Sequence, residues 1–92
     1  MAKARVSTII WGDEADPDGI IQYIADHGVT TEEVEEVLLN PENESMRNDG
    51  DTSLNTRGWT LAGRYLLVAW DWADETGGVA YIITAYGPDE EN

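Results

Sequence analysis

One histidine and a few arginines are the side chains of this sequence that could do chemistry near neutral pH. His27 is the single histidine, and an imidazole is the side chain that most readily transfers protons in that pH range. Arg57 and Arg64, together with Arg47, could clamp a phosphate if the fold brought them together. Structural roles are the alternatives. His27 would end a helix, where the helix dipole favours a cation, and the arginines would pair with surface acids.

A second candidate is a cation site in the most acidic stretch of the first half. Glu14, Asp16 and Asp18 match positions 1, 3 and 5 of a calcium loop, but Ala25 stands where the bidentate glutamate belongs. Asp16 before Pro17 also fits the N-cap and first residue of a helix. We favour the helix start, keep the cation site as the alternative, and predict no cofactor.

The aromatic residues are a third feature, with four tryptophans, four tyrosines and no phenylalanine. Trp70 and Trp72 lie two apart in an apolar run, so on a strand both point to one side and could stack nucleic-acid bases. Such a platform would lack a cationic groove in so acidic a chain. Core packing or a partner interface is therefore the expected use of these rings.

Composition excludes several classes of protein. The 92 residues contain 19 acidic and 5 basic side chains, a net charge of −14, which excludes binding of nucleic acid through overall charge. Without cysteine there is no disulfide or thiol chemistry. The acidity fits either the solvated surface of a protein from a salty cytoplasm or a surface for a basic partner. No apolar run approaches the roughly 20 residues of a membrane span, so we expect a single cytoplasmic domain without membrane contact.

The first half of the chain predicts one strand and two helices. A strand is expected over Val6–Trp11, and a helix from Asp16 to the glycine at position 28. A second helix begins at Thr30, which forms a capping box with Glu33, and ends before the Asn-Pro pair at 40–41. Its buried stripe is Val34, Val37 and Leu38, and its water-facing acids are Glu32, Glu33, Glu35 and Glu36.

The second half predicts strands. Residues 42–55 are polar and rich in turn residues; strands follow at Thr56–Ala62, Arg64–Trp72 and Val79–Tyr86, and an acidic tail covers 87–92. Both faces of Arg64–Trp72 are largely apolar, which indicates a central strand covered on both sides. The order β-α-α-β-β-β predicts an α+β domain with a core over 6–86, in which both helices pack on one face of a small antiparallel sheet.

Several segments resemble the BrnT-type family of toxins. They are residues 24–38, Asn40-Pro41, Gly58-Trp59-Thr60, residues 63–68 and residues 81–85. The shared features are a His-Gly-Val segment between two helices, a Gly-x-Thr and Gly-Arg hairpin, and a final strand. The resemblance implies the RelE-like ribonuclease fold and an mRNA-cleaving toxin held inactive by an antitoxin. It also implies that His27, Arg57 and Arg64 are the catalytic residues if the protein is active.

The sequence departs from that family where cations are expected. Asp26 precedes the His-Gly pair and Tyr86 ends the final strand, whereas family members carry basic residues at both positions. Because ribonuclease chemistry requires stabilisation of charge on the scissile phosphate, we expect a toxin-fold domain without efficient ribonuclease activity that binds an antitoxin-like or basic protein. The alternative is an active mRNA-cleaving toxin from a salt-adapted organism, with RNA as its substrate.

Overall fold

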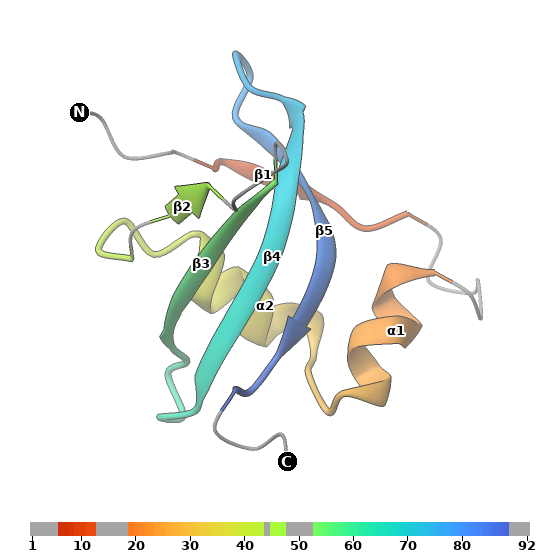
Figure 1. Ribbon diagram of the computed structural model, residues 1–92, viewed down its shortest axis with the longest axis vertical. Helices are drawn as coiled ribbons and strands as arrows, with labels where there is room; N and C mark the ends of the chain where they lie inside the picture. Colours follow the sequence, from red (N-terminus) through yellow and green to blue (C-terminus); the bar gives the residue numbers. More distant parts are fainter. Residues whose placement is uncertain (1–5, 13–18, 44, 48–52, 89–92) are drawn as a thin grey trace.

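The protein is an α+β domain, as predicted, and the part of the chain that the structure describes contains two helices and one five-stranded sheet, one strand more than expected (Figure 1). The computed structural model describes residues 6–12, 19–43, 45–47 and 53–88. The elements are β1 (Thr8–Ile10), α1 (Ile20–Asp26), α2 (Thr31–Leu38), β2 (Ser45–Arg47), β3 (Leu54–Trp59), β4 (Tyr65–Asp74) and β5 (Val79–Tyr86). The strands are ordered β1-β5-β4-β3-β2 across the sheet, so β4 is central, as the sequence predicted.

The sheet is mixed rather than purely antiparallel. β2, β3, β4 and β5 pair antiparallel, but β1 pairs parallel to β5, with Ile10 opposite Tyr81. The prediction of an antiparallel sheet is therefore wrong at this edge. A hairpin makes neighbouring strands antiparallel, but β1 and β5 are joined by a long stretch of chain that includes the helices. β2, in the polar stretch, was not predicted. β3 begins two residues earlier than predicted and ends at Trp59, because Thr60 already belongs to a turn in which its N–H donates to the carbonyl of Arg64 at 2.8 Å.

The ends of the helices only partly follow the sequence prediction. α1 begins at Ile20 with Gly19 as its N-cap, later than the predicted Asp16, which lies outside the described residues. It ends at His27, the C-cap, and Gly28 leaves the helix with φ +76°, a conformation that favours glycine. The capping box of α2 is confirmed: the Glu33 N–H donates to Thr30 Oγ1 at 3.2 Å, and the Thr30 N–H donates to Glu33 Oε1 at 3.0 Å.

In the view of Figure 1, α2 lies behind the strands and α1 lies beside β5. α1 packs against β5, and α2 packs against β3 and β4. None of the described elements covers the opposite face, so the prediction that β4 is covered on both sides is wrong. The side chains that β4 places on that face, Tyr65, Leu67 and Ala69, are only partly buried. We refer to this uncovered side of the sheet as the open face.

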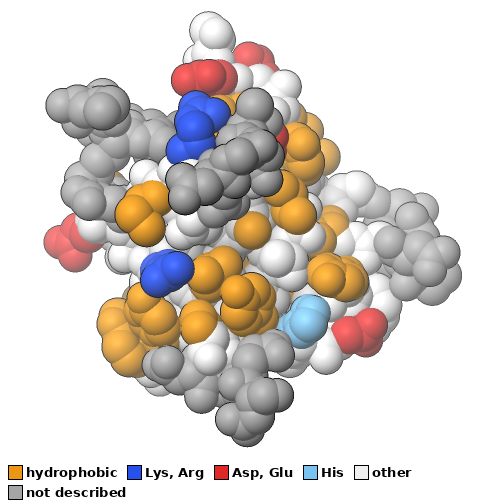
Figure 2. Space-filling view, viewed as in Figure 1, with side chains coloured by type: hydrophobic (Ala, Val, Ile, Leu, Met, Phe, Trp, Pro, Cys, Tyr) orange, Lys and Arg blue, Asp and Glu red, His pale blue; other side chains and the backbone are white. Residues whose placement is uncertain are grey.

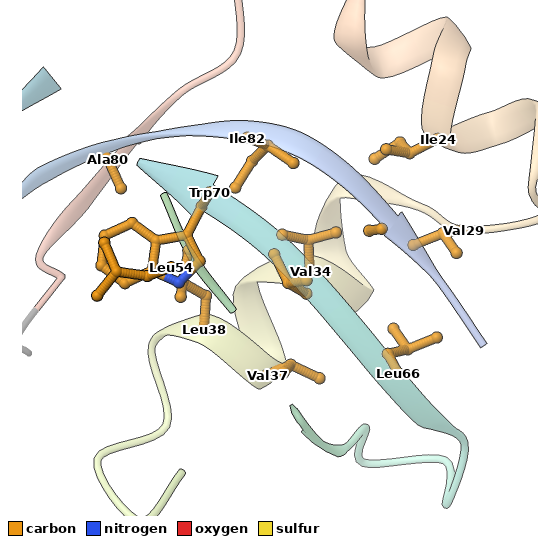
Figure 3. Close-up of a cluster of buried hydrophobic side chains, with 12 residues drawn as sticks. Ile24, Val29, Val34, Val37, Leu38, Leu54, Leu66, Trp70, Ala80 and Ile82 are labelled. Atoms are coloured by element: carbon orange, nitrogen blue, oxygen red, sulfur yellow. The ribbon is translucent and has the colours of Figure 1, made fainter. Parts of the chain in front are cut away.

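The core lies between the helices and the covered face (Figure 3). Its buried side chains are Ile24, Val29, Val34, Val37, Leu38, Leu54, Leu66, Val68, Trp70, Ala80, Ile82 and Ala85. Trp70 is fully buried, donates its Nε1–H to Thr56 Oγ1 at 2.9 Å, and meets the ring of Trp72 edge-on at 4.8 Å. The two tryptophans therefore pack in and beside the core, and neither forms a stacking platform.

The sequence predicted that all four acidic residues of α2 face water, and this is wrong for three of them. Glu32 is exposed, but the other three are partly buried because each meets a donor from another element. Glu33 pairs with Arg64, Glu35 accepts the Nε1–H of Trp11 at 3.4 Å, and Glu36 accepts the N–H of Leu61 at 2.9 Å. These carboxylates tie α2 to the sheet. Neither described helix is long and apolar enough to cross a membrane.

Candidate functional site on the open face

The open face carries exposed apolar and aromatic side chains. Strand register places four large ones there among the described residues: Ile10, Met46, Trp59 and Tyr81. Ile83, at the irregularity of β5 between Ile82 and Thr84, is exposed as well. Trp59 is 62% exposed and its ring lies 4.9 Å from that of Tyr65. Figure 2 shows hydrophobic side chains gathered over the strands, with the histidine at one side. Large apolar side chains gathered on one face are typical of an interaction site.

Two of the predicted catalytic residues lie on this face, on either side of a tyrosine. Arg57 on β3 is opposite Leu67 on β4, which is opposite Tyr86 on β5. Because neighbouring strands lie ~4.8 Å apart, the Cα atoms of Arg57 and Tyr86 are about 10 Å apart. The ring of His27, at the end of α1, lies 6.4 Å from the ring of Tyr86. His27, Tyr86 and Arg57 therefore form a row across the sheet, which we call the His–Tyr–Arg row.

Arg64 lies apart from this row and holds the turn between the two helices. Its Nη1 donates to the carbonyl of Gly28 at 2.6 Å and to Glu33 Oε1 and Oε2 at 3.2 and 3.3 Å. Both side chains of the ion pair are 22% exposed. The guanidinium is therefore occupied in joining the start of β4 to α2.

A shallow pocket of about 390 Å³ opens at the histidine end of the row, lined by Tyr23, His27, Thr84 and Tyr86. We call it the aromatic pocket. The rings of Tyr23 and His27 meet edge-on, with centroids 5.2 Å apart and planes at 79°. Sequence analysis missed Tyr23 and Thr84. The signal for Tyr23 was its position four residues before His27, which places the two side chains on one face of a helix.

A second shallow pocket, of about 380 Å³, lies at the arginine end of the row, lined by Glu42, Asn43, Met46, Asn55 and Arg57. Arg57 is exposed and makes no hydrogen bond or ion pair with any residue that the structure describes. It is therefore available to an incoming anionic group.

The alternative cation site at Glu14, Asp16 and Asp18 lies outside the described residues. Within the described ranges, no group of three or more histidine, aspartate or glutamate side chains is placed to hold a metal ion.

Together these features define an α+β domain with helices on one side of a mixed sheet and an open, aromatic surface on the other. Residues 20–87 match the family described as "Domain of unknown function (DUF4258)", and the chain belongs to this family. The matched region runs from the start of α1 to the residue after Tyr86, so it includes the whole His–Tyr–Arg row and the aromatic pocket. No curated protein and no solved structure matches the chain.

Proposed function

We propose that the protein is a toxin-fold domain of the BrnT/RelE type that acts as a protein-interaction module and binds a basic, antitoxin-like partner on its open face. The observation that carries this proposal is the set of large apolar side chains exposed on a sheet face that none of the described elements covers. An uncovered apolar sheet face exposes to water a surface that a partner would bury, and burial of apolar area is the main favourable term in protein association.

Charge favours a basic partner over RNA. With a net charge of −14, the domain attracts cationic surfaces and repels polyanions beyond the range of direct contact. The open face itself offers little to a phosphate chain, since Arg57 is the arginine that register places there among the described residues. Asp26 and Tyr86 stand where the resembling toxins carry cations. A protein segment with an apolar stripe and flanking basic residues complements both the surface and the charge.

The dimensions of the face fit a short helix or strand of such a partner. Five strands span about 19 Å between the outer two, which an α-helix crosses in about 13 residues. Amphipathic segments of that length bury their apolar side chains every third or fourth residue in a groove or face. A probe peptide of 14 residues therefore tests the surface without knowledge of the natural partner.

The proposal is tested by calorimetry with three such peptides: one with leucine and lysine on opposite helix faces, one with serine in place of leucine, and one with glutamate in place of lysine. We expect binding of the leucine–lysine peptide that survives 0.5 M NaCl (about a 4 to 5 Å screening length), weak and salt-sensitive binding of the serine peptide, and none of the glutamate peptide. Ile83→Asp should weaken the first interaction at least about tenfold, since it places a charge in an exposed apolar position of β5.

The matched control is Leu39→Asp. Leu39 is 40% exposed, close to the 43% of Ile83, but caps α2 away from the open face. Both variants change the net charge equally, so a difference between them locates the binding surface. If the two variants bind alike, or if the serine peptide binds as tightly as the leucine peptide, the open face is not the interaction site.

The second candidate function is an active mRNA-cleaving toxin from a salt-adapted organism. The observation that favours it is the His–Tyr–Arg row, in which an imidazole and a guanidinium without a polar partner among the described residues share one face and could serve as proton-transfer group and phosphate ligand. Incubation of RNA with sub-stoichiometric protein decides between the two candidates. Multiple-turnover cleavage that His27→Ala and Arg57→Ala abolish would establish the toxin activity and overturn the binding-only proposal.

A further inference from the structure

We propose that the aromatic pocket receives an arginine side chain of the basic partner. The inference rests on the proposed function and names the partner residue that this end of the open face recognises.

The walls of the pocket suit a flat cationic group. Tyr23, His27 and Tyr86 surround it with ring edges and faces at different angles, and Thr84 adds a hydroxyl as hydrogen-bond acceptor. A guanidinium is planar, stacks on aromatic faces, and donates from its edge at the same time. Tyr23 is 49% exposed, so one of the stacking surfaces is already accessible to a ligand.

Charge near the pocket has the sign that a cation requires. Asp26, the last residue of α1, directly precedes His27 of the pocket, is exposed, and accepts a hydrogen bond from Gln22 Nε2 at 3.1 Å. The overall charge of −14 adds a long-range field of the same sign. A lysine would feel the same field, but its compact and strongly hydrated ammonium does not stack on rings as a guanidinium does. Arginine is therefore favoured over lysine.

A nucleobase would also fit between aromatic rings, but the surroundings disfavour a nucleotide. Its phosphate would need a cation close to the pocket. Arg57 lies about 10 Å from Tyr86 across Leu67, and Arg64 is held by Glu33 and the carbonyl of Gly28. The described residue next to His27 in the sequence, Asp26, is thus a carboxylate, whereas a nucleotide requires a positive charge.

The direct test is NMR on the intact protein, with the ring protons of His27 as the reporter because the chain has a single histidine. N-acetylarginine amide, N-acetyllysine amide and adenosine monophosphate are titrated separately to millimolar concentration at constant pH and ionic strength. We expect a saturable shift with the arginine derivative at a concentration about three- to tenfold lower than with the lysine derivative. Adenosine monophosphate should bind more weakly than either.

Three variants locate the response. Tyr86→Leu and Tyr23→Leu each remove one ring and should abolish the preference for arginine, whereas Tyr81→Leu removes an exposed tyrosine of β5 outside the pocket and should retain it. Tyr23 is an exposed helix residue, so its variant remains informative if Tyr86→Leu does not fold. Circular dichroism verifies the fold of each.

The outcomes separate this inference from the proposed function. Equal responses to the arginine and lysine derivatives, or a preference that survives Tyr23→Leu, would overturn the arginine pocket even if the leucine–lysine peptide binds the open face. A stronger response to adenosine monophosphate would overturn it in favour of a nucleotide site. An arginine-selective shift without any peptide binding would support the arginine pocket and contradict the open face as the interaction site.

Discussion

Replacement of Arg64 by glutamine separates a catalytic role from a structural one for this residue. The resemblance to toxins places Arg64 among the catalytic groups, but its guanidinium donates to the carbonyl of Gly28 at 2.6 Å and to Glu33 at 3.2 Å. These contacts join the turn between α1 and α2 to the start of β4. Arg64→Gln removes the charge and shortens the side chain, so both contacts should be lost. We therefore expect the variant to lose stability.

The size of the loss follows from the two contacts. A hydrogen bond from a charged donor contributes about 1.5 to 3 kcal/mol, and the lower end applies because Gly28 is exposed and water can replace the donor. The ion pair with Glu33, in which each side chain is 22% exposed, adds at most about 0.2 to 1 kcal/mol after solvent screening. The expected total is about 2 kcal/mol of unfolding free energy, which lowers the melting temperature of a domain of this size by roughly 8 to 16 °C.

Urea unfolding followed by circular dichroism measures this loss. The matched control is Arg57→Gln, which removes the same charge from a side chain without a polar contact to any described residue, and should change stability by less than about 0.5 kcal/mol. If the two variants are equally stable, the hydrogen bond from Arg64 to the carbonyl of Gly28 contributes nothing to stability, and our account of Arg64 is wrong. If Arg64→Gln also abolished RNA cleavage at a temperature where it is fully folded, Arg64 would be catalytic after all.

Three further predictions test the core and the charge. Thr56→Val keeps the shape of a buried residue but leaves the Nε1–H of Trp70 without its 2.9 Å acceptor. Urea unfolding should therefore show a loss of about 1 to 3 kcal/mol in the free energy of unfolding. Ser45→Ala, which removes only the second partner of Thr56 Oγ1, should cost less. Leu38→Ala should cost about 2 to 5 kcal/mol in the same assay, because Leu38 is 6% exposed and packs in the core. A loss below about 0.5 kcal/mol would contradict the packing of α2 on the sheet. The melting temperature should rise between 0.01 and 1 M NaCl, as the screening length falls from about 30 to about 3 Å. Asp26→Asn, which removes a negative charge from the C-terminal end of α1, should increase the free energy of unfolding by roughly 0.3 to 1 kcal/mol at low salt and by little at 1 M. A flat melting temperature would mean that the acids are paired.

The features that the sequence predicted correctly are those set by neighbouring residues. The capping box at Thr30 and Glu33, the end of α1 at Gly28 and the strand Val79–Tyr86 depend on contacts or backbone preferences within a few positions. The parallel pairing of β1 depends instead on where a distant strand lies, and no local pattern specifies it. The same limit explains the acids of α2, whose partners Trp11, Leu61 and Arg64 come from other elements.

The open face could not be predicted for a different reason. Apolar residues on both sides of β4 predict burial on both sides, because the pattern reports hydrophobicity and not what covers it. A face kept for a partner has the same pattern as a face covered by a helix. The structure distinguishes the two, since α2 packs behind β3 and β4 and none of the described elements covers the opposite face. Likewise His27 and Arg57 are thirty positions apart in the chain, and only the register of β3, β4 and β5 places them on either side of Tyr86.

The identity of residue 86 links the fold to the proposed change of role. The position lies between the imidazole of His27 and the guanidinium of Arg57 on the open face, where a cation would face the charge of a scissile phosphate. A tyrosine supplies a ring and a hydroxyl there but no positive charge, and the surrounding charge of −14 works against any polyanion. The same ring, beside His27 and Tyr23, forms one wall of a pocket suited to a stacked cation. A tyrosine here is thus less favourable for phosphate, and more favourable for arginine, than the cation of the toxins that the sequence resembles, as the proposed function requires. Tyr86→Arg tests this directly: it should abolish the arginine response at His27, and the appearance of RNA cleavage in that variant would show that the rest of the catalytic geometry is still present.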